Sequence, residues 1–164
     1  MSKKDIIISE DQAFLRMARI CSRKEYSPFD ISQKLYRLGF SSEAIENIIN
    51  KLKTENYINE ERFARSFVND KLLINRWGVK KIEMHLKYKQ LSQSVIDDIL
   101  SEYSNTELNS SLQSILIKKW RQVKGESDYE KKGKLIKYAL GRGFKMDAII
   151  QCINNLNLND NDIN

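Results

Sequence analysis

The amino-acid sequence predicts an all-α protein, and three observations support this fold class. The chain has 164 residues but only six glycines and one proline, so few positions interrupt a helix. Apolar residues recur every three or four positions, which is the spacing of one helix face, and no segment alternates long enough to predict a strand. One pattern of apolar residues also occurs three times, at shifts of 51 and 104 positions, and such a period is typical of stacked helical repeats.

The three copies of the pattern cover residues 31–52, 82–103 and 135–156. Each copy contains a short break between two apolar runs, and these breaks are Gly39-Phe40, Gln90-Leu91 and Gly143-Phe144. Together with the helix before it, each copy predicts one three-helix repeat. The predicted organisation is an N-terminal arm (1–9), three repeats (10–55, 57–104 and 105–156) and a flexible tail (157–164).

The first repeat begins with a helix predicted at about residues 10–22, where the apolar side chains share one face. The next helix starts at Ser27-Pro28, because serine is a preferred N-cap and proline suits the first helical position. It ends at Gly39, which can take the left-handed conformation found after helix C-termini. A serine after the break caps the third helix.

The second repeat follows the same plan, with helices predicted at about 60–75, 77–86 and 92–103. At its start, Asn59 can cap the next helix, and Tyr57 and Phe63 are placed to hold the approach between two repeats. We therefore interpret the junction at 57–63 as structural rather than as a partner contact.

The third repeat is predicted to open with a long helix at about 106–123, followed by a polar loop at 124–128. Its last two helices lie on either side of Gly143-Phe144. Residues 157–164 lack an apolar face, so they are expected to fray.

Positive charge is concentrated in two blocks. Residues 61–90 have eight Lys and Arg against three acids, and residues 118–145 have ten against three. Residues 91–117 have four acids and no Lys or Arg. This arrangement favours a polyanionic or acidic partner that is met at two places.

Within these blocks, the charge lies on the middle helix of each repeat, opposite the apolar stripe. The candidate partner-binding residues are Lys80, Lys81, Lys87 and Tyr88 in the second repeat, and Lys131, Lys134, Lys137 and Tyr138 in the third. Basic side chains interleaved with tyrosines can bind phosphates, stack on bases or dock on an acidic protein surface. A DNA-reading helix-turn-helix is disfavoured, because the helices after the three breaks begin with acidic residues that phosphates would repel.

The sequence offers no site for catalysis. Its single histidine, His85, has no acid or thiol at helical spacing, and no glycine-rich phosphate loop is present. Asp97-Asp98 fit the first turn of a helix, where capping and the helix dipole explain them. We therefore predict a non-enzymatic protein without cofactor or metal.

Cys21 and Cys152 lie in apolar segments without a CxxC motif, so we interpret them as reduced core residues of a cytoplasmic protein. No apolar run approaches the length that spans a membrane, and no signal peptide is predicted.

Four segments in a fixed order resemble the RecX family, the bacterial regulators of the RecA recombinase. Residues 18–26 look like the family's first motif, R-x-x-S-x-x-E-L, and residues 35–40 look like its L-x-x-K-G-F motif. Residues 52–64 resemble L-x-x-x-G-Y-L-D-D-E-R-F-A, and the segment 77–86 follows in its expected place. The resemblance covers about 13–156, although Gln90 stands where the family usually has glycine.

The resemblance implies three tandem three-helix units that form an elongated, curved protein, and from the repeats we predict a monomer. It also implies binding in the groove of the RecA–DNA filament, with inhibition of filament growth, ATP hydrolysis, strand exchange and co-protease activity. Recombination, DNA repair and the SOS response would then be modulated negatively. The alternative left open by the residues is a DNA-binding helical protein, without sequence preference, that contacts single- or double-stranded DNA through its basic helix faces.

Overall fold

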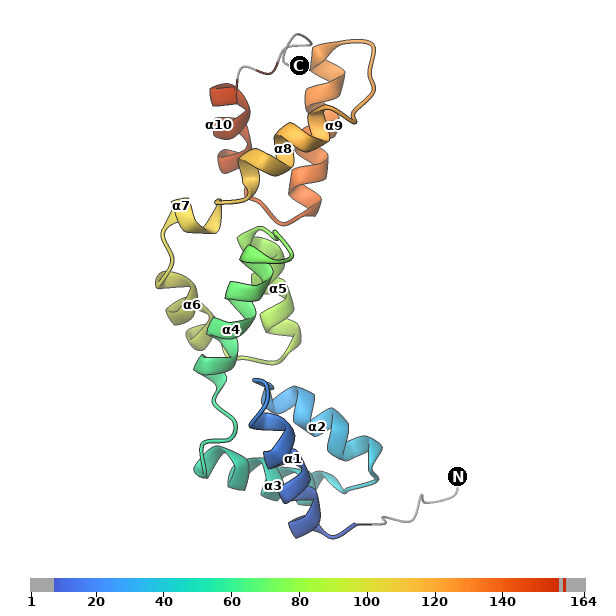
Figure 1. The fold of residues 1–164 in the computed structure, drawn as a ribbon, viewed down its shortest axis with the longest axis vertical. Helices are drawn as coiled ribbons and strands as arrows, with labels where there is room; N and C mark the ends of the chain where they lie inside the picture. Colours follow the sequence, from blue (N-terminus) through green and yellow to red (C-terminus); the bar gives the residue numbers. More distant parts are fainter. Residues whose placement is uncertain (1–7, 157, 159–164) are drawn as a thin grey trace. The chain divides into compact units, whose positions relative to one another are not determined.

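The computed structural model describes residues 8–156 and residue 158. These residues form ten helices and no strand, which confirms the all-α prediction (Figure 1). The helices are α1 (Glu10–Cys21), α2 (Pro28–Arg37), α3 (Ser42–Thr54), α4 (Glu60–Leu73), α5 (Val79–Tyr88), α6 (Gln93–Ser101), α7 (Asn105–Leu108), α8 (Leu112–Trp120), α9 (Asp128–Gly141) and α10 (Met146–Leu156). In the part of the chain that is described, none of these helices is both long enough and apolar enough to cross a bilayer.

Packing groups the chain into two compact units. Among the described residues, the first comprises residues 8–67 and 86–99, and the second comprises residues 68–85, 100–156 and 158. The helices α4, α5 and α6 contribute residues to both units.

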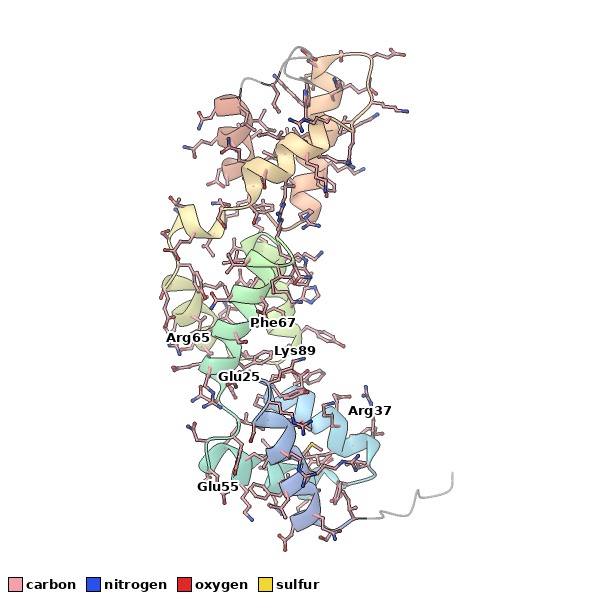
Figure 2. The ribbon with its side chains drawn as sticks, in the orientation of Figure 1. Glu25, Arg37, Glu55, Arg65, Phe67 and Lys89 are labelled. Carbon is pink, nitrogen blue, oxygen red and sulfur yellow. The ribbon has the colours of Figure 1, made fainter. Side chains whose placement is uncertain are left out.

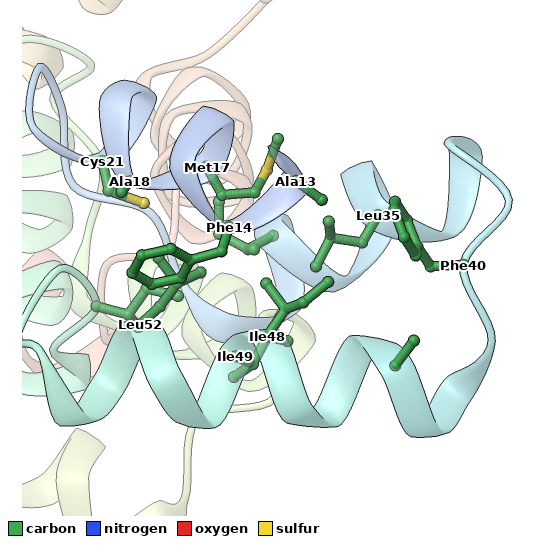
Figure 3. Packing of buried hydrophobic residues seen from close by; sticks show 13 residues of the cluster. Ala13, Phe14, Met17, Ala18, Cys21, Leu35, Phe40, Ile48, Ile49 and Leu52 are labelled. Atoms are coloured by element: carbon green, nitrogen blue, oxygen red, sulfur yellow. The ribbon is translucent and has the colours of Figure 1, made fainter. Parts of the chain in front are cut away.

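The first unit has its core between α1, α2 and α3 (Figure 3). Phe14 and Met17 of α1 face Ile48 and Leu52 of α3 across this core. Ser9 and Ser27 start α1 and α2 with reciprocal caps, in which the serine oxygen accepts a backbone N–H and the third helical residue bonds back. The predicted N-cap at Ser27 and the helix start at Pro28 are thereby confirmed.

The break after the middle helix has the same hydrogen bonds in all three repeats. The first residue of the break has positive φ: 92° at Gly39, 62° at Gln90 and 97° at Gly143. Its N–H donates to the carbonyl three residues earlier, and the next N–H donates to the carbonyl five residues earlier. This is the Schellman arrangement, and the second residue is a buried apolar side chain each time, namely Phe40, Leu91 and Phe144.

The junction before α4 is held by Asn59 and Arg62. Asn59 Oδ1 accepts the Arg62 N–H at 2.8 Å, as the predicted cap requires. The Arg62 guanidinium pairs with Glu25 Oε1 at 2.6 Å and donates to the carbonyl of Asn56 at 3.1 Å. Tyr57 packs edge-on against Phe14 with ring centroids 6.0 Å apart. These contacts support the structural interpretation of the junction.

The second unit has its core between α8, α9 and α10, with Leu116, Leu135 and Ile149 fully buried. The long helix predicted at 106–123 is wrong, because Asn109–Ser111 form a turn that separates α7 from α8. Leu158 is also buried against this core, which contradicts fraying at that position of the predicted tail. The other residues of the arm and the tail at 1–7, 157 and 159–164 lie outside the described residues.

The start of α5 lies directly on the break between α9 and α10, within the second unit. The Gly78 N–H donates to the Arg142 carbonyl at 2.8 Å, and the Lys80 N–H donates to the Gly143 carbonyl at 3.0 Å. A Cβ atom on Gly78 would lie 2.2 Å from the backbone carbonyl carbon of Gly143. Two glycines therefore permit a backbone contact that no side chain could enter.

Candidate partner-binding surfaces

The four candidate residues of the second repeat lie at the two ends of α5. Lys80 and Lys81 belong to the second unit, whereas Lys87 and Tyr88 belong to the first. Lys80 and Lys87 are exposed, as predicted from the helix pattern. Neither unit by itself contains all four residues.

Lys81 is less outward-facing than the helix pattern predicts. It is half-buried, and its Nζ lies 4.5 Å from the centroid of the Trp77 ring. The same ring lies 4.6 Å from the ring of His85, which is half-buried. Lys81 therefore stabilises the start of α5 through a cation–π contact rather than presenting a mobile charge to solvent.

Tyr88 is exposed and packs edge-on against Phe29 of α2, with ring centroids 5.7 Å apart. The contact orients the Tyr88 ring but leaves 69% of the residue accessible. Tyr88 thus remains available for stacking or for hydrogen bonding to a partner.

Three of the four candidates in the third repeat come together. Lys134, Lys137 and Tyr138 of α9 line a shallow hollow of about 360 Å³ with Lys119 and Val123. Lys131 is not among the lining residues, since it is half-buried with its Nζ 4.4 Å from the centroid of Trp120.

A second hollow of about 290 Å³ is also lined by Tyr138. Lys119 and Tyr138 line both hollows, and the Lys119 Nζ lies 4.5 Å from the centroid of the Tyr138 ring. We call the combined lining the Tyr138 surface: Arg76, Ile115, Lys118, Lys119, Gln122, Val123, Lys134, Lys137, Tyr138 and Arg142. Six of these ten residues are cationic and none is acidic, so the lining attracts anions.

The cations of the Tyr138 surface differ in how firmly they are held. Arg142 Nη2 donates to the carbonyls of Asn75 at 2.6 Å and Arg76 at 3.1 Å, which fixes the loop after α4 against the end of α9. Lys134 pairs with Glu130 at 3.5 Å and donates to the Lys124 carbonyl at 2.7 Å. Lys118 and Lys137 are exposed, as is Arg76, so the charges of these three side chains are accessible to a partner.

Sequence reasoning missed four cations of this surface, namely Arg76, Lys118, Lys119 and Arg142. Three of them lie in the charge block at 118–145, and this block was the feature of the sequence that could have identified them. Assigning the candidate residues to the middle helix of each repeat left out α8. A periodic pattern of apolar residues does not show that α8 packs against α9.

The chemistry of both cysteines agrees with a packing role. Burial, with a contribution from the Glu25 carboxylate, raises the pKa of the Cys21 thiol to about 11. Burial also raises the pKa of Cys152. Both thiols therefore stay protonated at neutral pH, which makes them poor nucleophiles and poor metal ligands. Among the described residues, His, Cys, Asp and Glu do not gather in threes that could hold a metal ion.

Three family models match this chain in order. They are described as the first, second and third three-helix domains of RecX, and they match residues 13–52, 59–100 and 107–153. The regulatory protein RecX of Prosthecochloris aestuarii is 31% identical over 81% of this chain and 85% of its own length. The regulatory protein RecX of Clostridium acetobutylicum is 31% identical over 87% of this chain and 69% of its own length.

Two solved structures have the same fold. A crystal structure of regulatory protein RecX matches with a TM-score of 0.80 and 22% identity, over 88% of this chain and 71% of the other. The crystal structure of RecX from Lactobacillus salivarius matches with a TM-score of 0.79 and 23% identity, over 92% of this chain and 97% of the other.

Proposed function

Because this chain belongs to the RecX family of regulatory proteins, we propose that it is a non-enzymatic regulator of the RecA recombinase. It binds in the groove of the RecA–DNA filament and inhibits filament growth, ATP hydrolysis, strand exchange and co-protease activity. Recombination, DNA repair and the SOS response are thereby modulated negatively. The protein acts in the cytoplasm, because such filaments form on the DNA of the bacterial cell. It acts there as a monomer.

The Tyr138 surface is the observation that supports this proposal most directly. Its six cations line two hollows without an acidic residue, so a partner with phosphates or carboxylates gains favourable electrostatic energy there. A RecA–DNA filament offers both groups. The surface is shallow and open, which suits docking on a macromolecule better than enclosing a small substrate.

The test reverses two accessible charges of this surface in the variant Lys118→Glu/Lys137→Glu. We expect a large loss of inhibition of RecA ATP hydrolysis, because each reversal replaces an attraction by a repulsion at the contact. Lys131 and Lys134 are less suitable positions, since both make contacts within the protein that reversal would also break.

A matched control makes the same change of net charge at side chains that do not line the surface. Lys124→Glu/Lys145→Glu reverses two exposed lysines that do not line either hollow. This control should inhibit ATP hydrolysis as the unmodified protein does. If Lys118→Glu/Lys137→Glu also inhibits normally, with unchanged helix content, the Tyr138 surface does not bind the filament.

The alternative function is direct binding to DNA without sequence preference, and the same six cations are the observation that favours it. Salt distinguishes the two functions. Binding through six to ten phosphates loses roughly three to five orders of magnitude in affinity between about 50 and 200 mM salt. Docking on the protein part of a filament falls less steeply, so parallel salt titrations with naked DNA and with filament separate the two.

A further inference from the structure

The first unit carries a separate cluster of positive charge. Residues 12–42 contain six cations, namely Arg16, Arg19, Arg23, Lys24, Lys34 and Arg37, and two acids, Glu25 and Asp30. This segment lies outside the two charge blocks at 61–90 and 118–145. The net charge that this segment presents to a partner depends on whether the two acids are already paired with other cations.

Both acids are paired with cations from outside the segment. Glu25 Oε1 accepts from Arg62 of α4 at 2.6 Å, and Asp30 Oδ1 accepts from Lys89 at 2.5 Å. Figure 2 labels Glu25 and Lys89, and both carboxylates are less than a quarter exposed. Burial alone would raise the pKa of Asp30, but hydrogen bonds from Lys89 and Ser27 hold it below its usual value, so Asp30 stays ionised and paired.

The six cations of the segment have no ion-pair partner among the residues that the structure describes. Arg16 and Arg19 lie on the side of α1 opposite its core residues, and Arg23 is exposed in the turn just after the end of this helix. The dipole of α1 favours a cation in its last turn and so accounts for Arg19, but it does not account for Arg16.

The row continues past the end of α1. Lys24 follows Arg23 in the chain, and the Nζ atoms of Lys24 and Lys34 lie 5.2 Å and 5.4 Å from the centroid of the Tyr26 ring. Arg37 is one turn further along α2 and projects from its end (Figure 2). We call these six cations the α1–α2 basic row.

The composition of the row identifies the chemistry of its partner. Four of the six cations are arginines, whose planar guanidinium groups bind phosphate oxygens in pairs. Protein–protein interfaces have an apolar centre, whereas nucleic-acid interfaces are polar and strongly positive. Arg16, Arg19 and Arg23 are all exposed, so three guanidinium groups can contact phosphates of one strand.

We propose that the α1–α2 basic row binds the phosphodiester backbone of a nucleic acid, at a site separate from the Tyr138 surface. The row belongs to the first unit and the Tyr138 surface to the second, so the chain has a phosphate-binding face in each. Binding at the row does not require the recombinase, and it can therefore be tested without assuming the regulatory function.

The test measures binding of the full-length protein to a fluorescent oligothymidylate by anisotropy, over a series of salt concentrations and without recombinase. Arg16→Gln/Arg19→Gln/Arg23→Gln removes three charges and introduces no repulsion. For three lost phosphate contacts, the slope of log affinity against log salt should become shallower by about 2, and affinity at roughly 0.1 M salt should fall about a hundredfold. A duplex of the same length shows whether the row prefers one strand or two.

Arg121→Gln/Lys124→Gln/Lys145→Gln is the matched control, because it removes three exposed cations outside both surfaces. It should keep the affinity and the slope of the unmodified protein, and thermal melts of both variants check folding. An unchanged slope in the Arg16→Gln/Arg19→Gln/Arg23→Gln variant overturns the proposal. So does a variant that binds DNA normally but no longer inhibits recombinase filaments, since its row would then bind protein.

Discussion

Gln90 is a residue whose backbone conformation does not suit its side chain. It has φ of 62° at the break after α5, where Gly39 and Gly143 occupy the equivalent positions. A non-glycine residue in the left-handed region destabilises the folded state by roughly 1–2 kcal/mol. Glycine has no such penalty, but it increases the conformational entropy of the unfolded chain. The hydrogen bond from the Gln90 N–H to the Lys87 carbonyl at 2.9 Å does not need the side chain.

We therefore predict that Gln90→Gly raises the free energy of unfolding by roughly 0.5–1 kcal/mol. Thermal denaturation followed by circular dichroism measures the change. The reverse exchange, Gly39→Gln, should lower the stability by a similar amount, because φ there is 92°. An equal or lower melting temperature for Gln90→Gly would show that its side chain stabilises the break in another way.

At the scale of elements, the sequence predicted what is local and missed what depends on distant contacts. The caps of α2, α3 and α4 and the three breaks follow from residues a few positions apart, and the structure confirms Ser27, Asn59 and Gly39 in these roles. The turn between α7 and α8 was missed because Asn109–Ser111 are each tolerated inside a helix. The close approach of α5 to the α9–α10 break was also missed, because Gly78 and Gly143 are far apart in the sequence.

That approach makes Gly143 irreplaceable. A Cβ atom there would lie 2.4 Å from the Lys81 Cβ, and φ of 97° already disfavours other residues. We expect Gly143→Ala to lower stability by more than about 2 kcal/mol, since the start of α5 must move away and its two backbone hydrogen bonds are lost. Hydrogen exchange should speed up at the amides of Gly78 and Lys80.

Gly133→Ala provides the control for this substitution. Gly133 lies inside α9 with open space around its Cα, so alanine should raise stability by about 1 kcal/mol through helix propensity. If Gly143→Ala melts like the unmodified protein and keeps slow exchange at Gly78, the glycine contact does not hold α5.

At the scale of the whole molecule, the candidate surfaces are distributed over both packing units. Lys87 and Tyr88 belong to the first unit, and the Tyr138 surface belongs to the second. The elongated, curved shape implied by the family resemblance stays a prediction, as do the limits of the three repeats. The charge of the site and the helix faces that carry it could be predicted from the sequence. That Lys118 and Lys119 lie together with Tyr138 could be seen only in the fold.

A filament repeats the same protomer along its groove, so a chain with two surfaces can contact it twice. The second contact is then intramolecular, and the combined affinity exceeds that of either surface alone by roughly a hundredfold or more. We predict that Lys80→Glu/Lys87→Glu and Lys118→Glu/Lys137→Glu each raise the concentration for half-inhibition of recombinase ATP hydrolysis by about that factor. Combining all four reversals should weaken inhibition further than either pair alone, because both of these contacts would then be lost. Normal inhibition by Lys80→Glu/Lys87→Glu would instead confine binding to the Tyr138 surface and exclude a two-point attachment through α5.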